Sequence, residues 1–224
     1  MTPGIKSAVI ICDGVFPKKE YPRYLIRQAD YIICCDAALK SYLRHCQSIF
    51  GKERKPDAVI GDLDSISPLL INKYSDIIIH ETEQENNDQT KAFKLVLSKY
   101  TDATELHILG ATGKRTDHTI GNVSLLMEYA RLFGPEISGK SVDMVTDYET
   151  VFAITDSIEL HCGKGRTVSI FSPDNSLRIK SSGLVWKTDD VVFDNWWKAT
   201  LNKASEDIVK LELSHKSIAL IMLN

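Results

Sequence analysis

The sequence predicts an α/β fold, with an N-terminal parallel-sheet α/β domain followed by a C-terminal antiparallel β-sandwich or barrel domain. Short apolar runs alternate with longer amphipathic segments over the first 133 residues, as in a sheet whose parallel strands are joined by helices. After Gly134-Pro135 the pattern changes to closely spaced strands separated by turn residues. We therefore expect one domain over residues 1–135 and a second, β-rich domain over residues 141–224.

Apolar runs and helical periodicity predict the elements of the first domain. In the helical segment Thr116–Phe133, apolar residues recur at the spacing of one helix face, and Asp88–Lys99 is the other clear helix. The expected buried strands are Ala8–Cys12, Tyr31–Cys35, Ala58–Ile60, Ile77–Ile79 and Leu106–Leu109.

Period-two alternation and frequent turn residues predict the strands of the second domain. Its candidate strands are Val142–Thr146, Thr167–Phe171, Leu177–Ile179, Ile208–Leu213 and Ile218–Leu223.

The composition excludes several classes of protein. The chain is 43% hydrophobic and 25% charged, as expected for a soluble globular protein. A formal net charge of -3 argues against a nucleic-acid partner. No apolar run has the length of a membrane span or of a signal peptide, so we expect a cytoplasmic protein with no membrane partner. Five cysteines without a CxxC pair are expected to be reduced core residues rather than a zinc site.

Two aspartates, Asp62 and Asp64, follow an expected buried strand. If the strand continues to them, both carboxylates point to the same side. In an open α/β sheet, ligands bind beyond the carboxyl ends of the strands, and Mg²⁺ takes one or two carboxylates together with substrate phosphates. The alternative is a solvated loop in which Ser65 caps the next helix.

Two further acids occupy equivalent places. Asp36 follows the strand Tyr31–Cys35, and Asp88 begins the helix after the fourth strand. Asp88 is also a good helix N-cap, and its position alone does not separate a cap from a ligand. Capping, however, explains only one of four acids expected at the same rim.

The fifth strand leads into a basic glycine loop, Gly110 to His118, which runs directly into the long helix. Glycines let the backbone approach an anion, the helix N-terminus offers free N–H groups, and Arg115 offers a two-pronged donor. The two glycines are too closely spaced for a Walker A loop. Lys114 is equally well explained as a solvated turn residue, and Asp117 either stabilises the helix terminus or orients or deprotonates an attacking hydroxyl.

These segments together resemble the catalytic domain of the thiamine pyrophosphokinases in order and spacing. The segments are Cys35–Ala38, Gly61–Ile66, Asn87–Lys91 and Gly110–His118, and the later Gly183–Trp186 is similar to a G-L-x-W segment in the family's thiamine-binding domain.

The resemblance implies a site for each ligand. It implies Mg²⁺ ligands at Asp36, Asp62, Asp64 and Asp88, and catalytic roles for Asp62, Asp64, Asp88, Arg115 and Asp117. ATP contacts are implied at Asp36, Thr90, Lys91, Gly110, Gly113, Lys114, Arg115 and His118. Thiamine contacts are implied at Trp186 and Asn202. An aromatic face suits a cationic thiazolium, although a half-buried strand tryptophan is an alternative explanation of Trp186.

The implied reaction moves a pyrophosphoryl group from ATP to the hydroxyl of thiamine and releases AMP. The proteins of the family that this chain resembles are homodimers, and two subunits share each thiamine site. The resemblance therefore implies a homodimer. Three places depart from the family pattern: Ala37 replaces a glycine, Leu201 replaces a serine, and Trp196-Trp197 has no counterpart.

Two other functions fit parts of the pattern. A magnesium-dependent phosphohydrolase also uses paired aspartates at a strand end, and it would release phosphate without thiamine. A non-catalytic thiamine or nucleotide sensor would bind its ligand without producing AMP.

Overall fold

The computed structural model describes residues 5–134 and 137–224, and these form two compact units. The first unit comprises residues 5–125 and 137–147, and the second comprises residues 126–134 and 148–224. Each unit is described separately below.

The first unit is built on a parallel sheet, as predicted. The strands pair in the order β6-β5-β1-β2-β3-β4 and every pairing is parallel. The five expected strands of this domain are confirmed with small shifts at their ends. The strands are β1 (Lys6–Ile11), β2 (Tyr31–Cys35), β3 (Ala58–Gly61), β4 (Ile78–His80), β5 (Ala103–Leu109) and β6 (Ser141–Val145).

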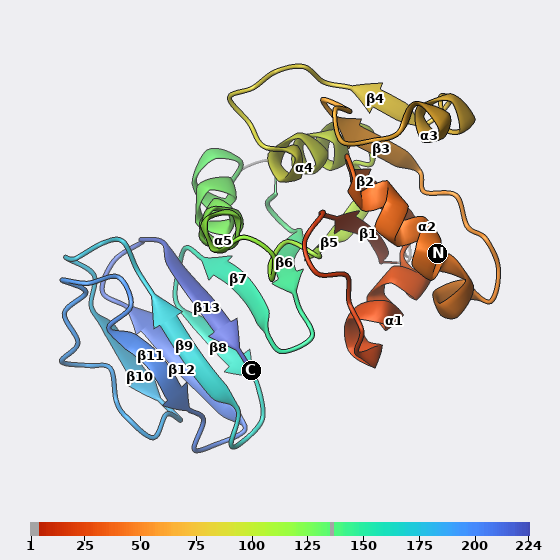
Figure 1. Ribbon diagram of the computed structural model, residues 1–224. Coiled ribbons are helices and arrows are strands. Elements are labelled where there is room, and N and C mark those ends of the chain that lie inside the picture. Colours follow the sequence, from red (N-terminus) through yellow and green to blue (C-terminus); the bar gives the residue numbers. More distant parts are fainter. Residues whose placement is uncertain (1–4, 135–136) are drawn as a thin grey trace. The chain divides into compact units, whose positions relative to one another are not determined.

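Helices cover both faces of this sheet (Figure 1). One face packs against α1 and α2, forming a core in which Val9, Ile32 and Tyr42 are fully buried. The other face packs against α4, which contacts β1, β2 and β3. The helices of this unit are α1 (Glu20–Gln28), α2 (Ala38–Phe50), α3 (Pro68–Lys73), α4 (Asp88–Lys99) and the first part of α5 (Thr116–Leu132), whose residues from 126 on belong to the second unit.

The strand order reverses beside β1. The chain adds β2, β3 and β4 on one side of β1, and then crosses back to place β5 on its other side. The loops that follow β1 and β5 therefore diverge from the carboxyl ends of these two strands. An open α/β sheet forms its ligand crevice at such a place. Because β2 and β3 are the next strands, their carboxyl ends lie on the same rim.

The second unit is an antiparallel sandwich. One sheet has the order β11-β9-β13-β7, the other has the order β10-β12-β8, and their pairings are antiparallel. Buried side chains from both sheets, including Ile170, Leu211 and Ile221, form one core. Its strands are β7 (Thr150–Ile154), β8 (Ile158–His161), β9 (Thr167–Phe171), β10 (Ile179–Ser182), β11 (Ala199–Lys203), β12 (Ile208–Leu213) and β13 (Ala219–Leu223).

One predicted strand pairs differently from the expectation. The segment expected at Val142–Thr146 was grouped with the antiparallel strands, but the corresponding β6 is the parallel neighbour of β5. Its alternation resembles that of a half-buried strand because only Met144 and Val145 are buried.

Among the described residues, no helix is long and apolar enough to cross a bilayer.

Candidate active site

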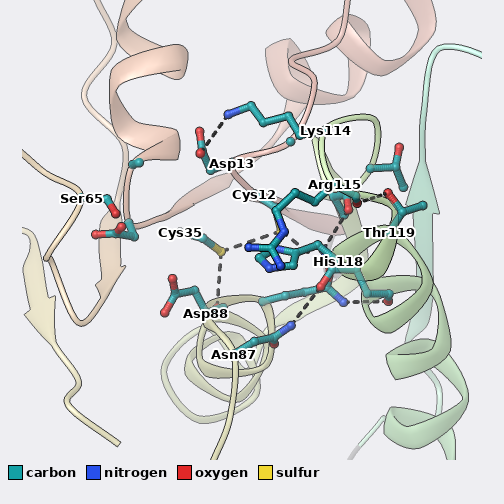
Figure 2. Close-up of a pocket in the computed structure, with 17 residues that line it drawn as sticks. Cys12, Asp13, Cys35, Ser65, Asn87, Asp88, Lys114, Arg115, His118 and Thr119 are labelled. Carbon is teal, nitrogen blue, oxygen red and sulfur yellow. Dashed lines mark hydrogen bonds and ion pairs between the residues drawn. The ribbon is translucent and has the colours of Figure 1, made fainter. Parts of the chain in front are cut away.

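A cavity of about 330 Å³ lies in the first unit, beyond the carboxyl ends of β1, β2 and β5. Asp88 lies at one side of this cavity, called the acidic side, and Arg115 and His118 lie at the other, called the basic side, while Asp13 lies beside Lys114 (Figure 2). It is lined by Cys12, Asp13, Gly14, Cys35, Asp36, Ala37, Ser65, Asn87, Asp88, Gln89, Ala111, Thr112, Lys114, Arg115, His118, Thr119 and Asn122.

Three carboxylates converge on the acidic side. Asp36, Asp62 and Asp64 each offer an oxygen, and these oxygens lie within 4.8 Å of one another. The convergence does not arise from an extended strand, because β3 ends at Gly61 and Leu63 has a φ of 66°. A turn therefore brings both aspartates to the rim. Asp36 follows β2 with a φ of 42°, and its N–H donates to the carbonyl of Ile60 at 2.9 Å.

Asp36 is the electrostatically strained member of this group. Its side chain is buried, and Oδ1 has no hydrogen-bond partner among the described residues. Burial raises the pKa of Asp36, and the nearby charges of Asp88 and Asp62 raise it further. An unpartnered buried carboxylate oxygen is costly unless a cation or a proton compensates it.

This donor set fits Mg²⁺. Carboxylate oxygens are the ligands that Mg²⁺ prefers, and neighbouring oxygens in its octahedron lie ~3 Å apart. The three oxygens lie within 4.8 Å of one another, so a bound ion would draw them closer together. A cation here would also satisfy the buried Oδ1 of Asp36 and offset the repulsion between the carboxylates.

Asp88 is not the N-cap of α4, which resolves one of the alternatives left by the sequence. The cap is Asn87, whose side chain accepts a hydrogen bond from the N–H of Thr90 at 3.0 Å. The carboxylate of Asp88 instead lines the cavity. Burial raises the pKa of Asp88, Lys91 opposes that shift from 3.6 Å, and the charge of Asp62 adds to it.

The capping alternative proposed for Ser65 is wrong. The helix after β3 has Ser67 at its N-cap, without a side-chain capping bond, and Ser65 Oγ donates to Oδ1 of Asp64 at 2.9 Å. Ser65 therefore supports the acidic group rather than a helix.

The basic side is the loop between β5 and α5. Gly110 has a φ of 65°, and a Cβ there would lie 2.7 Å from the carbonyl oxygen of Cys12, so only glycine fits between the two loops. Lys114 Nζ lies 2.9 Å from Oδ2 of Asp13. Arg115 donates to both oxygens of Asp117, at 3.0 and 2.5 Å, and these bonds lower the pKa of Asp117 to about 2.

The cavity brings together only part of the predicted ATP and catalytic set. Asp36, Asp88, Lys114, Arg115 and His118 line it. Asp62 and Asp64 do not line the cavity, but their carboxylates lie close to that of Asp36, which does. Gly110 and Gly113 shape the loop without lining the cavity, and Asp117 faces Arg115.

Thr90 and Lys91 lie apart from the cavity lining. Both are buried in α4, and Lys91 Nζ donates to the carbonyl of Glu81 at 3.0 Å. With Asp88 at 3.6 Å, Lys91 is placed as a charge partner of that aspartate.

Sequence reasoning missed five residues of the lining, namely Cys12, Asp13, Gly14, Thr119 and Asn122. Asp13 comes soon after β1, and the rule that identified Asp36 at the end of β2 would also have found it. Asn122 carries no local signal, because it lies in the interior of α5 and depends on contacts with distant segments.

The second unit has its own cavity, of about 260 Å³, lined by Trp186, Lys187, Leu201 and Asn202 among others. Trp186 is 61% exposed. Asn202 is buried, and its amide accepts from Trp186 N at 3.2 Å and donates to Trp186 O at 2.6 Å. Asn202 therefore fixes the backbone of Trp186, while the indole face stays accessible.

Two family models match the chain. The model for the thiamin pyrophosphokinase catalytic domain matches residues 22–135, more than half of the chain, and the model for the thiamin pyrophosphokinase substrate-binding domain matches residues 150–219. The chain belongs to the thiamin pyrophosphokinase family. The resemblance read from the motifs is thereby confirmed, in both halves of the sequence.

Two relatives found by sequence similarity carry the name of the same family. The chain is 27% identical over 155 residues to thiamine pyrophosphokinase 1 of Oryza sativa subsp. japonica, covering 61% of this chain and 54% of that protein. It is 25% identical over 142 residues to thiamine pyrophosphokinase 1 of Arabidopsis thaliana, covering 56% of this chain and 52% of that protein. The matched region thus spans about half the length of these relatives.

Solved structures confirm the fold. The thiamine pyrophosphokinase of Bacillus subtilis superposes with a TM-score of 0.75 at 14% identity, covering 98% of this chain and 99% of that one. The yeast enzyme gives 0.75 at 15% identity, covering 99% and 88%. The enzyme of Candida albicans gives 0.73 at 18% identity, covering 98% and 88%. A parallel α/β unit and an antiparallel β unit are therefore the architecture of this thiamin pyrophosphokinase family member.

Proposed function

We propose that this chain is a magnesium-dependent thiamine pyrophosphokinase, which transfers a pyrophosphoryl group from ATP to the hydroxyl of thiamine and releases AMP. Family membership gives the reaction class. The observation that carries the proposal is the convergence of three carboxylates, one with a buried and unpartnered oxygen, on a cavity whose other side is basic. A divalent cation bound to a polyphosphate matches that charge distribution.

The acidic side would hold the metal. Asp36, Asp62 and Asp64 are its ligands in this proposal. Asp88 lies outside this group of oxygens, although its charge acts on Asp36, and it would bind a metal-bound water. When bound, Mg²⁺ neutralises phosphate oxygens and increases the electrophilicity of the phosphorus.

The basic side would hold the phosphates. Arg115 offers planar paired donors, Lys114 an ammonium group, and the N-terminus of α5 the positive end of the helix dipole. In the structure both cations are paired with carboxylates, Lys114 with Asp13 and Arg115 with Asp117. These pairs are exposed and therefore contribute little stability, so a polyphosphate can compete for the cations.

Asp117 is the residue we assign to the attacking hydroxyl. An aspartate is ionised at neutral pH, so Asp117 can accept a hydrogen bond from the hydroxyl of thiamine, with or without Arg115 beside it. A carboxylate is a weak base at that pH. Asp117 would therefore orient the hydroxyl for in-line attack on the β-phosphorus, and the gain in rate would come mainly from alignment and charge neutralisation.

We place thiamine at the cavity of the second unit, against the exposed face of Trp186. An indole attracts a thiazolium cation by ~0.5–2 kcal/mol. Asn202, predicted as a direct contact, acts in this proposal through the backbone of Trp186. We also propose a homodimer that shares the thiamine site and acts in the cytoplasm, as the family resemblance implies.

The test is AMP release from Mg-ATP by the purified chain, measured with and without thiamine, with Asp62→Asn as the control. The proposal expects AMP that requires thiamine and is lost in the variant. Thiamine-independent phosphate release would instead indicate a hydrolase, and thiamine binding without AMP would indicate a sensor.

A further inference from the structure

The side chain of Asn122 connects the two sides of the catalytic cavity. Its Nδ2 donates to the carbonyl of Ala111 at 2.8 Å, in the basic loop after β5. Its Oδ1 accepts from Nδ2 of Asn87 at 2.9 Å, at the N-terminus of α4. One amide therefore bonds to two segments that are distant in the sequence, and both of them line the cavity.

The backbone of the same residue adds a third connection. The carbonyl of Asn122 accepts from Nε2 of Gln89 at 3.1 Å. Asn87 and Gln89 are the two neighbours of Asp88 in the sequence, so the residues on both sides of this acid are bonded to Asn122. Asn87 also caps α4 through the N–H of Thr90, which ties the start of the helix to the same network.

We propose that Asn122 is a positioning residue, which fixes the acidic start of α4 at Asp88 relative to the phosphate-binding loop at Ala111. This inference rests on the proposed function, because it assigns Asn122 to the geometry in which Mg-ATP reacts. Asn122 acts through Asp88 and the loop backbone and performs no chemical step itself.

The chemistry of the position requires an amide. Asn122 must donate to a carbonyl on one side and accept from an amide on the other, and aspartate and leucine, which are similar in size, lack the donor or both groups. Asparagine is also a mediocre residue for a helix interior, so helix propensity does not explain it at this point of α5. Its bonds leave the helix, whereas a residue that stabilised α5 alone would bond within it.

The first test compares Asn122→Ala with Ser124→Ala, a control on the same helix outside the cavity lining. We expect Asn122→Ala to lower kcat for thiamine-dependent AMP release ~10–100-fold, as when a metal ligand loses its orienting partner. KM for thiamine should change less than about threefold, and the control should keep the wild-type kcat. An unchanged kcat in Asn122→Ala would overturn the inference.

A second variant distinguishes a loss of activity from a folding defect. Asn87→Ser keeps a hydroxyl that can cap α4, but it is too short to reach Asn122 and introduces no charge. We expect a wild-type melting temperature with kcat lowered ~3–10-fold. A lower melting temperature with unchanged kcat would indicate that the network is only structural, and would contradict the inference.

The double variant tests whether the two side chains act as one link. If they do, adding Asn87→Ser to Asn122→Ala lowers kcat no further, because the bond is already absent. Independent, multiplying losses would contradict a shared role.

Binding separates this inference from the proposed function. Calorimetry with a non-hydrolysable Mg-ATP analogue should show weaker binding to Asn122→Ala than to wild type, by about fivefold or more, whether or not AMP is formed. If the wild-type chain binds the analogue but forms no AMP with thiamine, the proposed function is contradicted and the inference about Asn122 is not. If wild type and variant show equal binding and equal kcat, the inference about Asn122 is contradicted and the proposed function is not.

Discussion

Gly61 and Asp36 approach so closely that no side chain fits between them: a Cβ at Gly61 would lie 2.9 Å from Cβ of Asp36. The same Cβ would lie 3.3 Å from Oδ1 of Asp88. Gly61 ends β3 directly before Asp62, so the absence of a side chain there allows the acids of three segments to lie close together.

Gly61→Ala is therefore expected to remove activity by displacing Asp36 rather than by unfolding the chain. A displacement of about 1 Å at a reacting centre can cost 10²-fold in rate, and we expect a loss of kcat/KM of about that size. The measurement is thiamine-dependent AMP release at saturating Mg²⁺, with far-UV circular dichroism as the folding control. A folded, fully active Gly61→Ala variant would show that the acids need not lie this close.

Asp62→Asn keeps the shape of the side chain and removes one charge from the proposed metal site. Losing one electrostatic contact to the transition state costs on the order of 3 kcal/mol, so kcat should fall ~10²–10³-fold. Because Asp62 is partly exposed, the melting temperature should be nearly unchanged. Asp76→Asn, an exposed aspartate paired with Lys55, is the matched control and should stay active. If Asp62→Asn and Asp76→Asn have the same kcat, the assignment of Asp62 to the metal site is contradicted.

Trp186→Ala is expected to weaken thiamine binding and to leave ATP binding unchanged. Loss of a cation–π contact of ~0.5–2 kcal/mol corresponds to a rise in KM for thiamine of about 2–30-fold. Trp186→Phe keeps an aromatic face and should lose less. Steady-state KM values for both substrates measure this, and an equal rise in KM for ATP would indicate a general structural defect.

The pair formed by the buried His107 and the partly buried Asp143 should make stability depend on pH. Burial alone lowers the pKa of His107, but the hydrogen bond that Nδ1 of His107 donates to Asp143 at 2.7 Å, together with the charge of Asp143 and a smaller effect of Glu105, leaves the pKa raised. A raised folded-state pKa stabilises the fold fully below the unfolded value of ~6.5 and loses that contribution as pH rises through the folded value.

Asp143→Asn should therefore destabilise the chain by roughly 1–2 kcal/mol near pH 6, and by less as the pH rises. Denaturant unfolding at several pH values measures the difference. Glu105→Gln, which removes a carboxylate 3.9 Å from the same imidazole, should have the smaller effect. A difference that grows with pH would contradict the assigned charge state.

The strand-end acids were predictable from the sequence because they depend on local order alone. A buried strand followed by an acid places that acid at the sheet rim, and this rule found Asp36, Asp62 and Asp64. It gave the right location for Asp62 and Asp64 although the extended geometry assumed for them was wrong, because the turn at Leu63 replaces the strand.

The remaining features depend on contacts that are distant in sequence. Asn87 rather than Asp88 caps α4, and both residues are good caps, so composition does not decide between them. Two of the connections of Asn122 form only when α4 and α5 lie side by side, and the third needs the loop after β5. Lys91 is buried, and it bonds to the carbonyl of Glu81, which lies outside α4. The parallel pairing of β6 with β5 is likewise set by the neighbouring strand rather than by its own pattern.

The most direct measurement is the identity and ratio of the products, followed by phosphorus-31 NMR or mass spectrometry after incubating the purified chain with Mg-ATP and thiamine. The account predicts thiamine diphosphate and AMP in equal amounts, since one pyrophosphoryl group leaves each ATP. Formation of ADP with thiamine monophosphate, or of free phosphate without any thiamine ester, would contradict it.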